Sequence, residues 1–265
     1  MEYIHTILNQ RLYLLPEKAI YWEEQNAILI ADLHLGKITH FRKSGIAVPK
    51  GPDYKNWLTL TCLIQTYNPE KIIILGDLFH SNYNQEWKTF LEVIDAYSKI
   101  EWILVKGNHD ILSKGKYESS GLVVYDDKLD IGPFRLVHEP LSPHELKSYD
   151  NKGYDDHNLQ DDKLISQVNI KPNDDFTKQV HEMTNREETD NDMKYILCGH
   201  IHPAIRLQGT GRQSARVPCF YFSKHQAILP AFGAFTGMYT IQPKEQDQVF
   251  LVVQNKVLNA SEMFV

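Results

Sequence analysis

Short runs of apolar residues recur along the chain, and each of five such runs ends in a cluster of polar residues. The runs are the size of single strands and occupy residues 27–31, 72–75, 102–106, 134–137 and 195–198. Two longer stretches, residues 54–67 and 85–98, separate the first three runs and are compatible with helices. The first half of the chain therefore predicts a βαβαβ arrangement of parallel, buried strands.

The end of the chain has a different pattern. The segments "PCFYF", "QAILP", "MYTI" and "VFLVV" are strand-like and have no long helical stretches between them. Such a series predicts a second sheet with more antiparallel pairing. With 265 residues, of which 42% are hydrophobic, the chain can bury the core of one large α/β domain, and we assign residues 1–265 to a single domain.

Residues 145–192 interrupt this organisation. This segment holds 13 acidic and 6 basic residues, whereas the rest of the chain holds 21 acidic and 22 basic residues. Its polar doublets show neither helical nor strand periodicity, so we interpret it as an inserted, partly mobile excursion, either a solvated loop or a partner-binding segment. The formal net charge of −6 belongs to this segment. It therefore does not argue against an anionic substrate.

Membrane association and disulfide bonding are both disfavoured by the sequence. The apolar stretches fall far short of the ~20 residues that a bilayer requires, and the first residues lack the pattern of a signal peptide. We therefore expect a cytoplasmic protein. The cysteines Cys62, Cys198 and Cys219 are scattered and form no Cys-x-x-Cys pair, so we expect reduced thiols in or near the core.

Each of the five apolar runs is followed by potential metal ligands. These are Asp32 and His34, Asp77, Asn108, His138, and His200 and His202. Residues at i and i+2 of a strand share a face, so each of the two spaced pairs is expected to aim both side chains at one point. The set is sufficient for two divalent metal ions that share a bridging carboxylate. Mixed nitrogen and oxygen ligands without thiolate favour Mn²⁺, Fe or Zn²⁺ over Mg²⁺ or Ca²⁺.

The ordered series Asp-x-His, Gly-Asp, Gly-Asn-His-Asp, His and Gly-His-x-His resembles the calcineurin-like metallophosphoesterase family. Longer blocks, among them "LLPEKAIYW", "ADLHLGKITHFRKSGIAVPKG" and "LPAFGAFTG", look like the bacterial ligase-associated DNA damage response endonuclease family, the PdeM-like branch. The resemblance covers nearly the whole chain except the acidic segment. It implies an α/β fold, a four-layer αββα sandwich of two mixed sheets flanked by helices. It also implies phosphodiester hydrolysis in DNA repair, with a repair ligase or helicase as partner.

The resemblance also implies a role for each ligand. It assigns the first metal ion to Asp32, His34, Asp77 and His202. It assigns the second metal ion to Asp77, Asn108, His138 and His200. Asp77 would bridge two ions, for which Mn²⁺ is favoured and Zn²⁺ or Fe is the alternative. Such a pair of ions clamps a phosphate and supplies the hydroxide that attacks phosphorus.

His109 is not a ligand in this pattern. The resemblance places it above the metal centre, where it would protonate the leaving oxygen or stabilise the charge on phosphorus. Asp110 would hold the imidazole of His109 in place.

Candidate substrate-binding residues lie in the loops beyond the ligands. Residues 36–55 carry five Lys or Arg residues against one acidic residue. Lys37 and Arg42 could follow the phosphates of a single-stranded DNA, and His40 could stack on a base, although a solvated surface explains the charges equally well. His80 is expected either to contact substrate or to form part of a turn. Residues 229–237 either turn close to the active site or form a packed β-turn.

Three functions are compatible with these patterns. The first is a metal-dependent phosphodiesterase that acts on DNA. The second is a phosphatase, or a nucleotide or cyclic-nucleotide hydrolase that acts on a small phosphoester. The third is a non-catalytic adaptor, which is disfavoured because all seven ligand positions and His109 are present.

Overall fold

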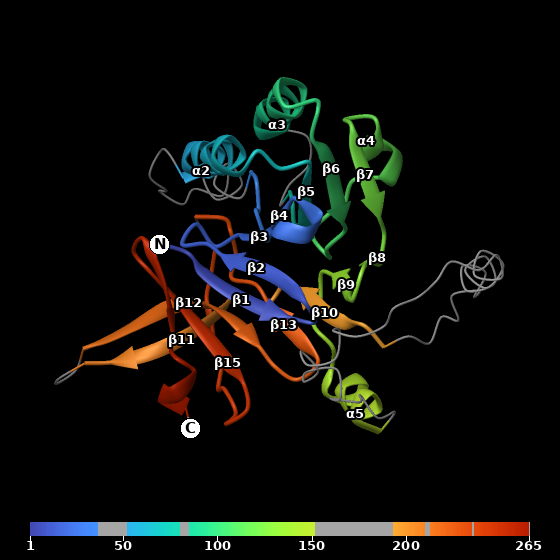
Figure 1. The fold of residues 1–265 in the computed structure, drawn as a ribbon. Coiled ribbons are helices and arrows are strands. Elements are labelled where there is room, and N and C mark those ends of the chain that lie inside the picture. Colours follow the sequence, from blue (N-terminus) through green and yellow to red (C-terminus); the bar gives the residue numbers. More distant parts are fainter. Residues whose placement is uncertain (37–51, 80–84, 152–192, 210–212, 235, 265) are drawn as a thin grey trace, which may run out of the picture.

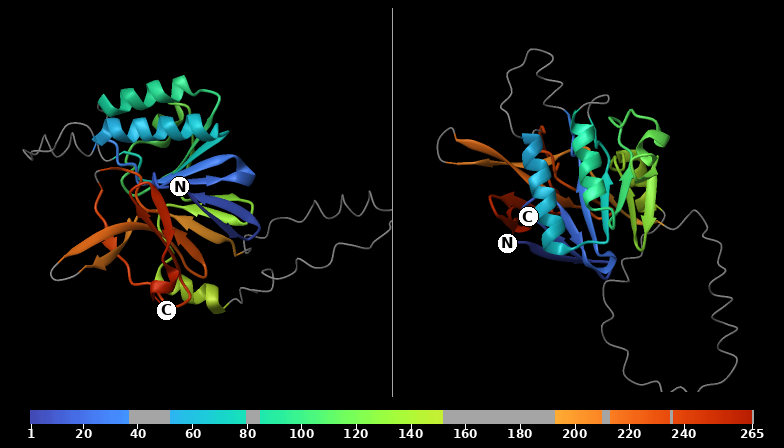
Figure 2. Two further views of the ribbon diagram at one scale, coloured as in Figure 1. Left: turned by 60° about the vertical axis from the view of Figure 1, so that its left-hand side comes forward. Right: turned by 90° about the horizontal axis from the view of Figure 1, so that it is seen from above.

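Two β-sheets lie face to face in the computed structural model, and helices cover their outer faces (Figures 1 and 2). The structure describes residues 1–36, 52–79, 85–151, 193–209, 213–234 and 236–264. Both sheets are mixed, and helices from separate parts of the chain form the two outer layers. This arrangement confirms the predicted αββα fold.

The first sheet has seven strands in the order β1-β2-β3-β4-β5-β6-β7. Its strands are β1 (Tyr3–Ile7), β2 (Gln10–Leu14), β3 (Ile20–Trp22), β4 (Ala27–Ala31), β5 (Lys71–Leu75), β6 (Glu101–Val105) and β7 (Leu122–Tyr125). Strands β4 to β7 pair in parallel, whereas β1 to β4 pair antiparallel. The three predicted parallel strands of the first half correspond to β4, β5 and β6.

Two helices connect these strands and confirm the predicted βαβαβ order. Helix α2 (Pro52–Tyr67) precedes β5, and α3 (Gln85–Ala96) precedes β6. They lie side by side on the outer face of the first sheet, near the short helix α4 (Lys114–Glu118) (Figure 2). The apolar stripe of α3, formed by Trp87, Phe90 and Ile94, belongs to the core between these helices and the sheet.

The second sheet has nine strands and is mainly antiparallel. Its strands are β8 (Lys128–Ile131), β9 (Phe134–Val137), β10 (Tyr195–Cys198), β11 (Pro203–Gln208), β12 (Ser214–Phe222), β13 (Gln226–Ile228), β14 (Tyr239–Thr240), β15 (Gln248–Val253) and β16 (Lys256–Asn259). Parallel pairing joins β9, β10 and β13 at its centre. The predicted second sheet is confirmed, and it also contains β9 and β10, two of the five strands that carry candidate ligands.

Strand β4 shows how the sequence builds two cores at once. Ala27, Leu29 and Ala31 pack into the core between the two sheets. The alternate residues, Ile28 and Ile30, pack into the core between the first sheet and the helices α2 and α3. All five residues are buried. A strand covered on both faces reads as a continuous apolar run, which is the pattern found in the sequence.

Helix α5 (Pro143–Asn151) and the 3-10 helix η3 (Ser261–Phe264) lie on the outer side of the second sheet (Figure 1). Asp150 anchors α5 because its Oδ1 lies 2.8 Å from Nε2 of His225 and 3.0 Å from Nζ of Lys224. The first part of the acidic segment, residues 145–151, belongs to α5 and is helical, although its sequence shows no helical periodicity. The rest of that segment, 152–192, lies outside the described residues.

The cysteine prediction is partly correct. Cys198 and Cys219 are buried, and burial raises the pKa of the Cys219 thiol to about 12. Cys62 is exposed instead, because it lies on the side of α2 that faces away from the buried residues Trp57, Leu60 and Ile64. None of the helices in the described part of the chain has the length and apolar character needed to cross a membrane.

Candidate metal centre

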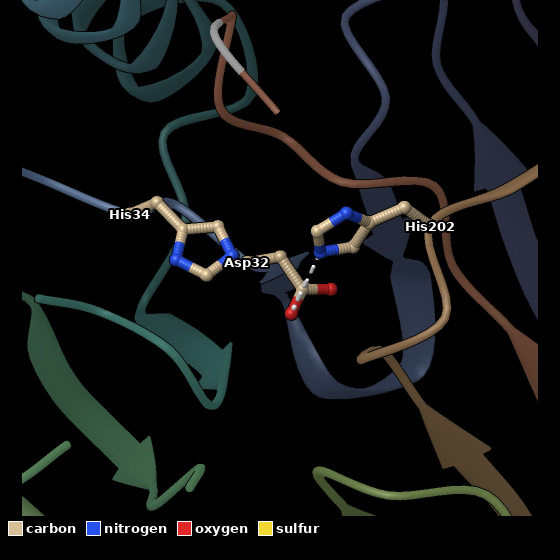
Figure 3. A group of neighbouring side chains, drawn as sticks. All are labelled: Asp32, His34 and His202. Carbon is tan, nitrogen blue, oxygen red and sulfur yellow. Dashed lines mark ion pairs between the residues drawn. The ribbon is translucent and has the colours of Figure 1, made fainter. Parts of the chain in front are cut away.

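The predicted ligands gather into two adjacent groups. Asp32, His34 and His202 form the first group, and Asp77, His138 and His200 form the second. Within each group the potential ligand atoms lie within 4.8 Å of one another. Figure 3 shows the first group, in which the carboxylate of Asp32 lies beside the imidazole ring of His202. Asn108 adjoins the second group, with its Oδ1 3.1 Å from Nε2 of His138.

The centre lies where the two sheets meet. The ends of β4, β5 and β6 supply residues from the first sheet, and the ends of β9 and β10 supply residues from the second. Gly199 allows the sheets to approach closely, because a Cβ atom there would lie 2.6 Å from Oδ2 of Asp32 and 2.7 Å from Cβ of Ala31. The backbone amide of His200 then donates a hydrogen bond to Oδ2 of Asp32, at 2.9 Å.

The backbone at the ligands is unusual. Five of the seven predicted ligands have positive φ angles: Asp32 at 54°, His34 at 48°, Asp77 at 53°, His200 at 70° and His202 at 55°. Left-handed backbone costs a residue with a side chain ~1 kcal/mol or more, and such strain is concentrated at functional sites.

This geometry corrects the explanation based on strand alternation. Asp32, His34, His200 and His202 all follow their strands, so left-handed turns and not the pleat of a strand direct their side chains. His200 and His202 also join different groups, and so do not meet at one point. A left-handed turn leaves no periodic signal in the sequence. The i, i+2 spacing of these residues was therefore interpreted as the alternation of a strand.

The carboxylate of Asp77 connects the two groups. Its Oδ2 lies 3.6 Å from Nε2 of His34, and its Oδ1 lies 3.5 Å from Nε2 of His138. Oδ1 also accepts a hydrogen bond of 3.0 Å from the backbone amide of His109. One oxygen therefore faces each group, which is the placement that a bridging ligand requires.

His138 is oriented by the first sheet. Its Nδ1 lies 3.0 Å from the carbonyl oxygen of Leu75, and because a carbonyl only accepts, Nδ1 carries the hydrogen. Nε2 is then the nitrogen with a free lone pair, and it lies 3.0 Å from Nδ1 of His200. Metal-ligating histidines are commonly oriented through their second nitrogen in this way. The sequence did not reveal this partner because a backbone carbonyl has no residue signature.

His202 follows the same rule with a different partner. Its Nδ1 lies 3.1 Å from the carbonyl oxygen of Gly237, so Nε2 faces Oδ1 of Asp32 at 3.4 Å. Both of these facing atoms are buried and have no hydrogen-bond partner among the described residues. A cation between them would satisfy both, so the residues fit a divalent metal ion. The contact also places Gly237, the last residue of the segment 229–237, beside the centre, which favours one of the two alternatives expected from the sequence.

Asp110 supports the loops that carry the ligands. Its Oδ1 accepts hydrogen bonds from the backbone amides of Leu78, at 3.0 Å, and Phe79, at 3.2 Å, and from the hydroxyl of Tyr117, at 3.3 Å. Its Oδ2 accepts one of 2.9 Å from the backbone amide of Gly107. Burial raises the pKa of this carboxyl, and the amide hydrogen bonds oppose the shift. The carboxylate thus ties the loop after β5 to the loop after β6.

His109 is exposed and lies next to the first group. Its ring centroid is 5.7 Å from that of His34, in an edge-on arrangement. The imidazole is thus close to the ligands and open to a substrate. That Asp110 positions this imidazole stays a prediction. The candidate substrate-binding residues Lys37, His40, Arg42 and His80 lie outside the described residues.

Comparison with known proteins agrees with this geometry. The family model for calcineurin-like phosphoesterase matches residues 26–204. The crystal structure of Pseudomonas putida nuclease MPE is similar to this chain with a TM-score of 0.68 and 25% sequence identity, over 98% of this chain and 100% of that one. The protein of unknown function AQ665 from Aquifex aeolicus has a TM-score of 0.37 and 19% identity, over 70% of this chain and 82% of that one. No curated protein matches the sequence.

The family match spans more than half of the chain and contains all seven predicted ligands. This protein therefore belongs to the calcineurin-like phosphoesterase family. It is a metal-dependent hydrolase of phosphate esters, as the sequence predicted.

Proposed function

We propose that the protein is a metal-dependent phosphodiesterase that cleaves single-stranded DNA, with a role in DNA repair. The observation that carries this proposal is the similarity to nuclease MPE, which extends over 98% of this chain and 100% of that nuclease. A shared core alone would accommodate many phosphoester substrates. Similarity along the whole length also includes the second sheet, which supplies His138, His200 and His202 to the centre.

The ligand assignment forms part of the proposal. Asp32, His34, Asp77 and His202 would hold one metal ion. Asp77, Asn108, His138 and His200 would hold the other. The donor set of carboxylate, amide and imidazole groups favours Mn²⁺, with Zn²⁺ or Fe as alternatives. When bound, two such ions acidify water and neutralise charge on the phosphate.

The protein's own groups supply orientation and a proton. The exposed imidazole of His109 would donate its proton to the leaving alkoxide oxygen, a role that is worth ~10²- to 10⁴-fold in rate. The backbone amide of His109 donates a hydrogen bond to Oδ1 of Asp77, which holds the backbone of His109 close to the proposed ligands. The carboxylate of Asp110 would hold the loop, and with it the imidazole, in position.

The experiment that tests this proposal compares three substrates of the manganese-loaded protein. We expect faster hydrolysis of bis-p-nitrophenyl phosphate, a diester, than of p-nitrophenyl phosphate, a monoester, and opening of circular single-stranded DNA. An Asp77→Ala variant purified in parallel controls for contaminating nucleases. Preference for the monoester would contradict the proposal and favour a phosphatase. Diester hydrolysis with intact circles would instead favour a hydrolase of nucleotides or cyclic nucleotides.

A further inference from the structure

Lys18 occupies an unfavourable position in a tight turn. It lies in the turn formed by residues 15–19, between β2 and β3. The backbone amide of Lys18 donates a hydrogen bond to the carbonyl oxygen of Leu15, and the amide of Leu15 donates one to the carbonyl oxygen of Ala19, both of 2.9 Å. The φ of Lys18 is 65°. Glycine is preferred in this left-handed position, and a lysine there costs ~1 kcal/mol. The hydrogen bonds of the turn fix the point at which the lysine side chain leaves the backbone.

The side chain of Lys18 reaches toward the metal centre. Its ammonium group lies 3.3 Å from the carbonyl oxygen of Gly233. The backbone amide of Gly233 in turn bonds to the carbonyl oxygen of Asp32, at 3.2 Å. A single residue, Gly233, therefore connects the ammonium group to Asp32, a proposed ligand.

Two neighbouring cavities meet at Lys18. The inner cavity has a volume of about 200 Å³, and its walls include Lys18, His202, Gly233, Ala234, Thr236 and Met238. The outer cavity has a volume of about 330 Å³, and its walls include Glu17, Lys18, Lys55, Asn56, Phe232 and Ala234. His202, a proposed ligand, lines the inner cavity, and Lys18 lines both cavities, so the two cavities lead from one edge of the metal centre to the ammonium group.

Hydrogen bonds hold the described residues that line the two cavities. Asn56 is buried at the start of α2, and its Oδ1 accepts a hydrogen bond of 2.9 Å from the backbone amide of Ala234. The hydroxyl of Thr236 donates to the carbonyl of Gly233, at 3.0 Å. These bonds fix the segment that joins Lys18 to the ligand loops, so the ammonium group has a defined place relative to the centre.

The wall of the outer cavity carries two lysines and one acidic residue. Burial, together with repulsion from Lys55, lowers the pKa of Lys18 to about 8. No carboxylate among the described residues pairs with the ammonium group of Lys18 or of Lys55. Glu17 is the acidic residue of this wall, and it is exposed. Two ammonium groups that repel each other, and that pair with no carboxylate among the described residues, form a site that an anion would stabilise.

We propose that Lys18 and Lys55 form a subsite for a second phosphate group of the substrate, the phosphodiester next to the one that is cleaved. This inference rests on the proposed function, because only a substrate with successive phosphates reaches both the metal centre and the outer cavity. Lysine suits such a contact, since it binds a phosphate oxygen as a point charge without requiring a fixed planar geometry. The subsite would favour oligonucleotides over small diesters.

The test measures binding without turnover. A short fluorescent oligothymidylate is titrated with the full-length protein in chelator, over a series of salt concentrations. Lys18→Met is expected to weaken binding about tenfold and to flatten the slope of log affinity against log salt by ~0.7, the value for one lost phosphate contact on a single strand. Lys18→Arg, which keeps the charge, should bind like the wild type. So should Lys256→Met, an exposed control in β16.

An unchanged affinity and salt slope in Lys18→Met would overturn the inference. Lys55→Met repeats the test at an exposed residue, in case Lys18→Met does not fold. A second readout is the rate of hydrolysis by the manganese-loaded protein. Lys18→Met should reduce the rate on the oligonucleotide about ten times more than it reduces the rate on bis-p-nitrophenyl phosphate. Equal losses would also overturn the inference, since Lys18 would then act through Gly233 on the centre itself. If the wild type hydrolyses no diester, the proposed function fails, and the binding result still decides the subsite.

Discussion

The Nδ1 atom of His138 lies 3.0 Å from the carbonyl oxygen of Leu75, so a residue of the second sheet is held by the last residue of a strand in the first. Gly76 follows Leu75 directly, and a Cβ atom at Gly76 would overlap the ring of His138. The metal centre therefore depends on a close fit between two sheets whose strands are far apart in the sequence.

Gly76→Ala should disrupt this fit. The new methyl group would displace the His138 ring, and the φ of 74° would add strain, so we expect a loss of about 3 kcal/mol or more in the free energy of unfolding and weakened metal binding. The matched control is Gly132→Ala, which has a φ of 53° but no atom within 4 Å of the added methyl group. It should cost ~1 kcal/mol and leave metal binding intact. Denaturant unfolding and manganese titration measure both effects, and equal costs would argue against the contact with His138.

Asp110 should stabilise the fold through its hydrogen bonds to the backbone. Asp110→Asn places an amide against at least one backbone donor, so we expect a loss of about 2 to 3 kcal/mol in the free energy of unfolding. Tyr117→Phe removes one of the bonds to the same carboxylate without reversing a donor, and should cost about 1 kcal/mol. Urea titration of the two variants distinguishes these effects. If Asp110→Asn costs no more than Tyr117→Phe, the amide hydrogen bonds do not support the loops.

His109→Gln should separate chemistry from metal binding. The variant is expected to bind as much manganese as the wild type, because the imidazole is not a proposed ligand. Hydrolysis of an oligonucleotide should fall ~10²- to 10⁴-fold, the usual contribution of a positioned general acid. Diesters with very good leaving groups should lose less, since they need less help from a proton. Loss of manganese, measured by elemental analysis, would instead identify His109 as a ligand.

His5 should make the protein less stable in mild acid. It packs against Phe222 and Phe250, its Nε2 has no hydrogen-bond partner among the described residues, and burial lowers its pKa from 6.5 to about 4. The unfolded chain takes up the proton first, so the stabilisation is present above pH ~6.5 and is lost as the pH falls toward ~4.

This loss should amount to about 2 kcal/mol, allowing for the partial exposure of the ring. The measurement is the free energy of unfolding across this pH range. His5→Phe, which does not titrate, should have a flatter profile than the wild type. Profiles of the same slope would show that His5 is not responsible.

Much of the fold follows from local patterns. The apolar run of β4 was identified with its observed bounds, and β5 and β6 to within one residue, because a strand buried on both faces leaves a continuous signal. The membership of β9 and β10 in the second sheet was not predicted. Sheet membership depends on pairing between distant segments, such as Leu197 with Leu136 and with Ala227, and no local pattern specifies it.

The candidate site could be predicted to a similar extent. The seven candidate ligands were predicted from ordered motifs, and the structure brings their side chains together; that they bind metal ions stays a prediction. The parts that were missed depend on the backbone: the left-handed turns at Asp32 and His200, and the carbonyl groups of Leu75 and Gly237 that orient the histidines. Lys18 was missed as well, because its significance depends on a turn and two cavities formed by remote segments.

The central claim is that phosphodiester hydrolysis depends on divalent metal ions held around Asp77. The most direct measurement is hydrolysis of bis-p-nitrophenyl phosphate by chelator-stripped protein as Mn²⁺ is added back, with Asp77→Ala and the exposed Asp95→Ala in parallel. The wild type and Asp95→Ala should be inactive when stripped and should regain most of their activity. Asp77→Ala should stay inactive, because both proposed ions lose a ligand. Full activity of the stripped wild type, or recovery of Asp77→Ala at wild-type manganese concentrations, would contradict the claim.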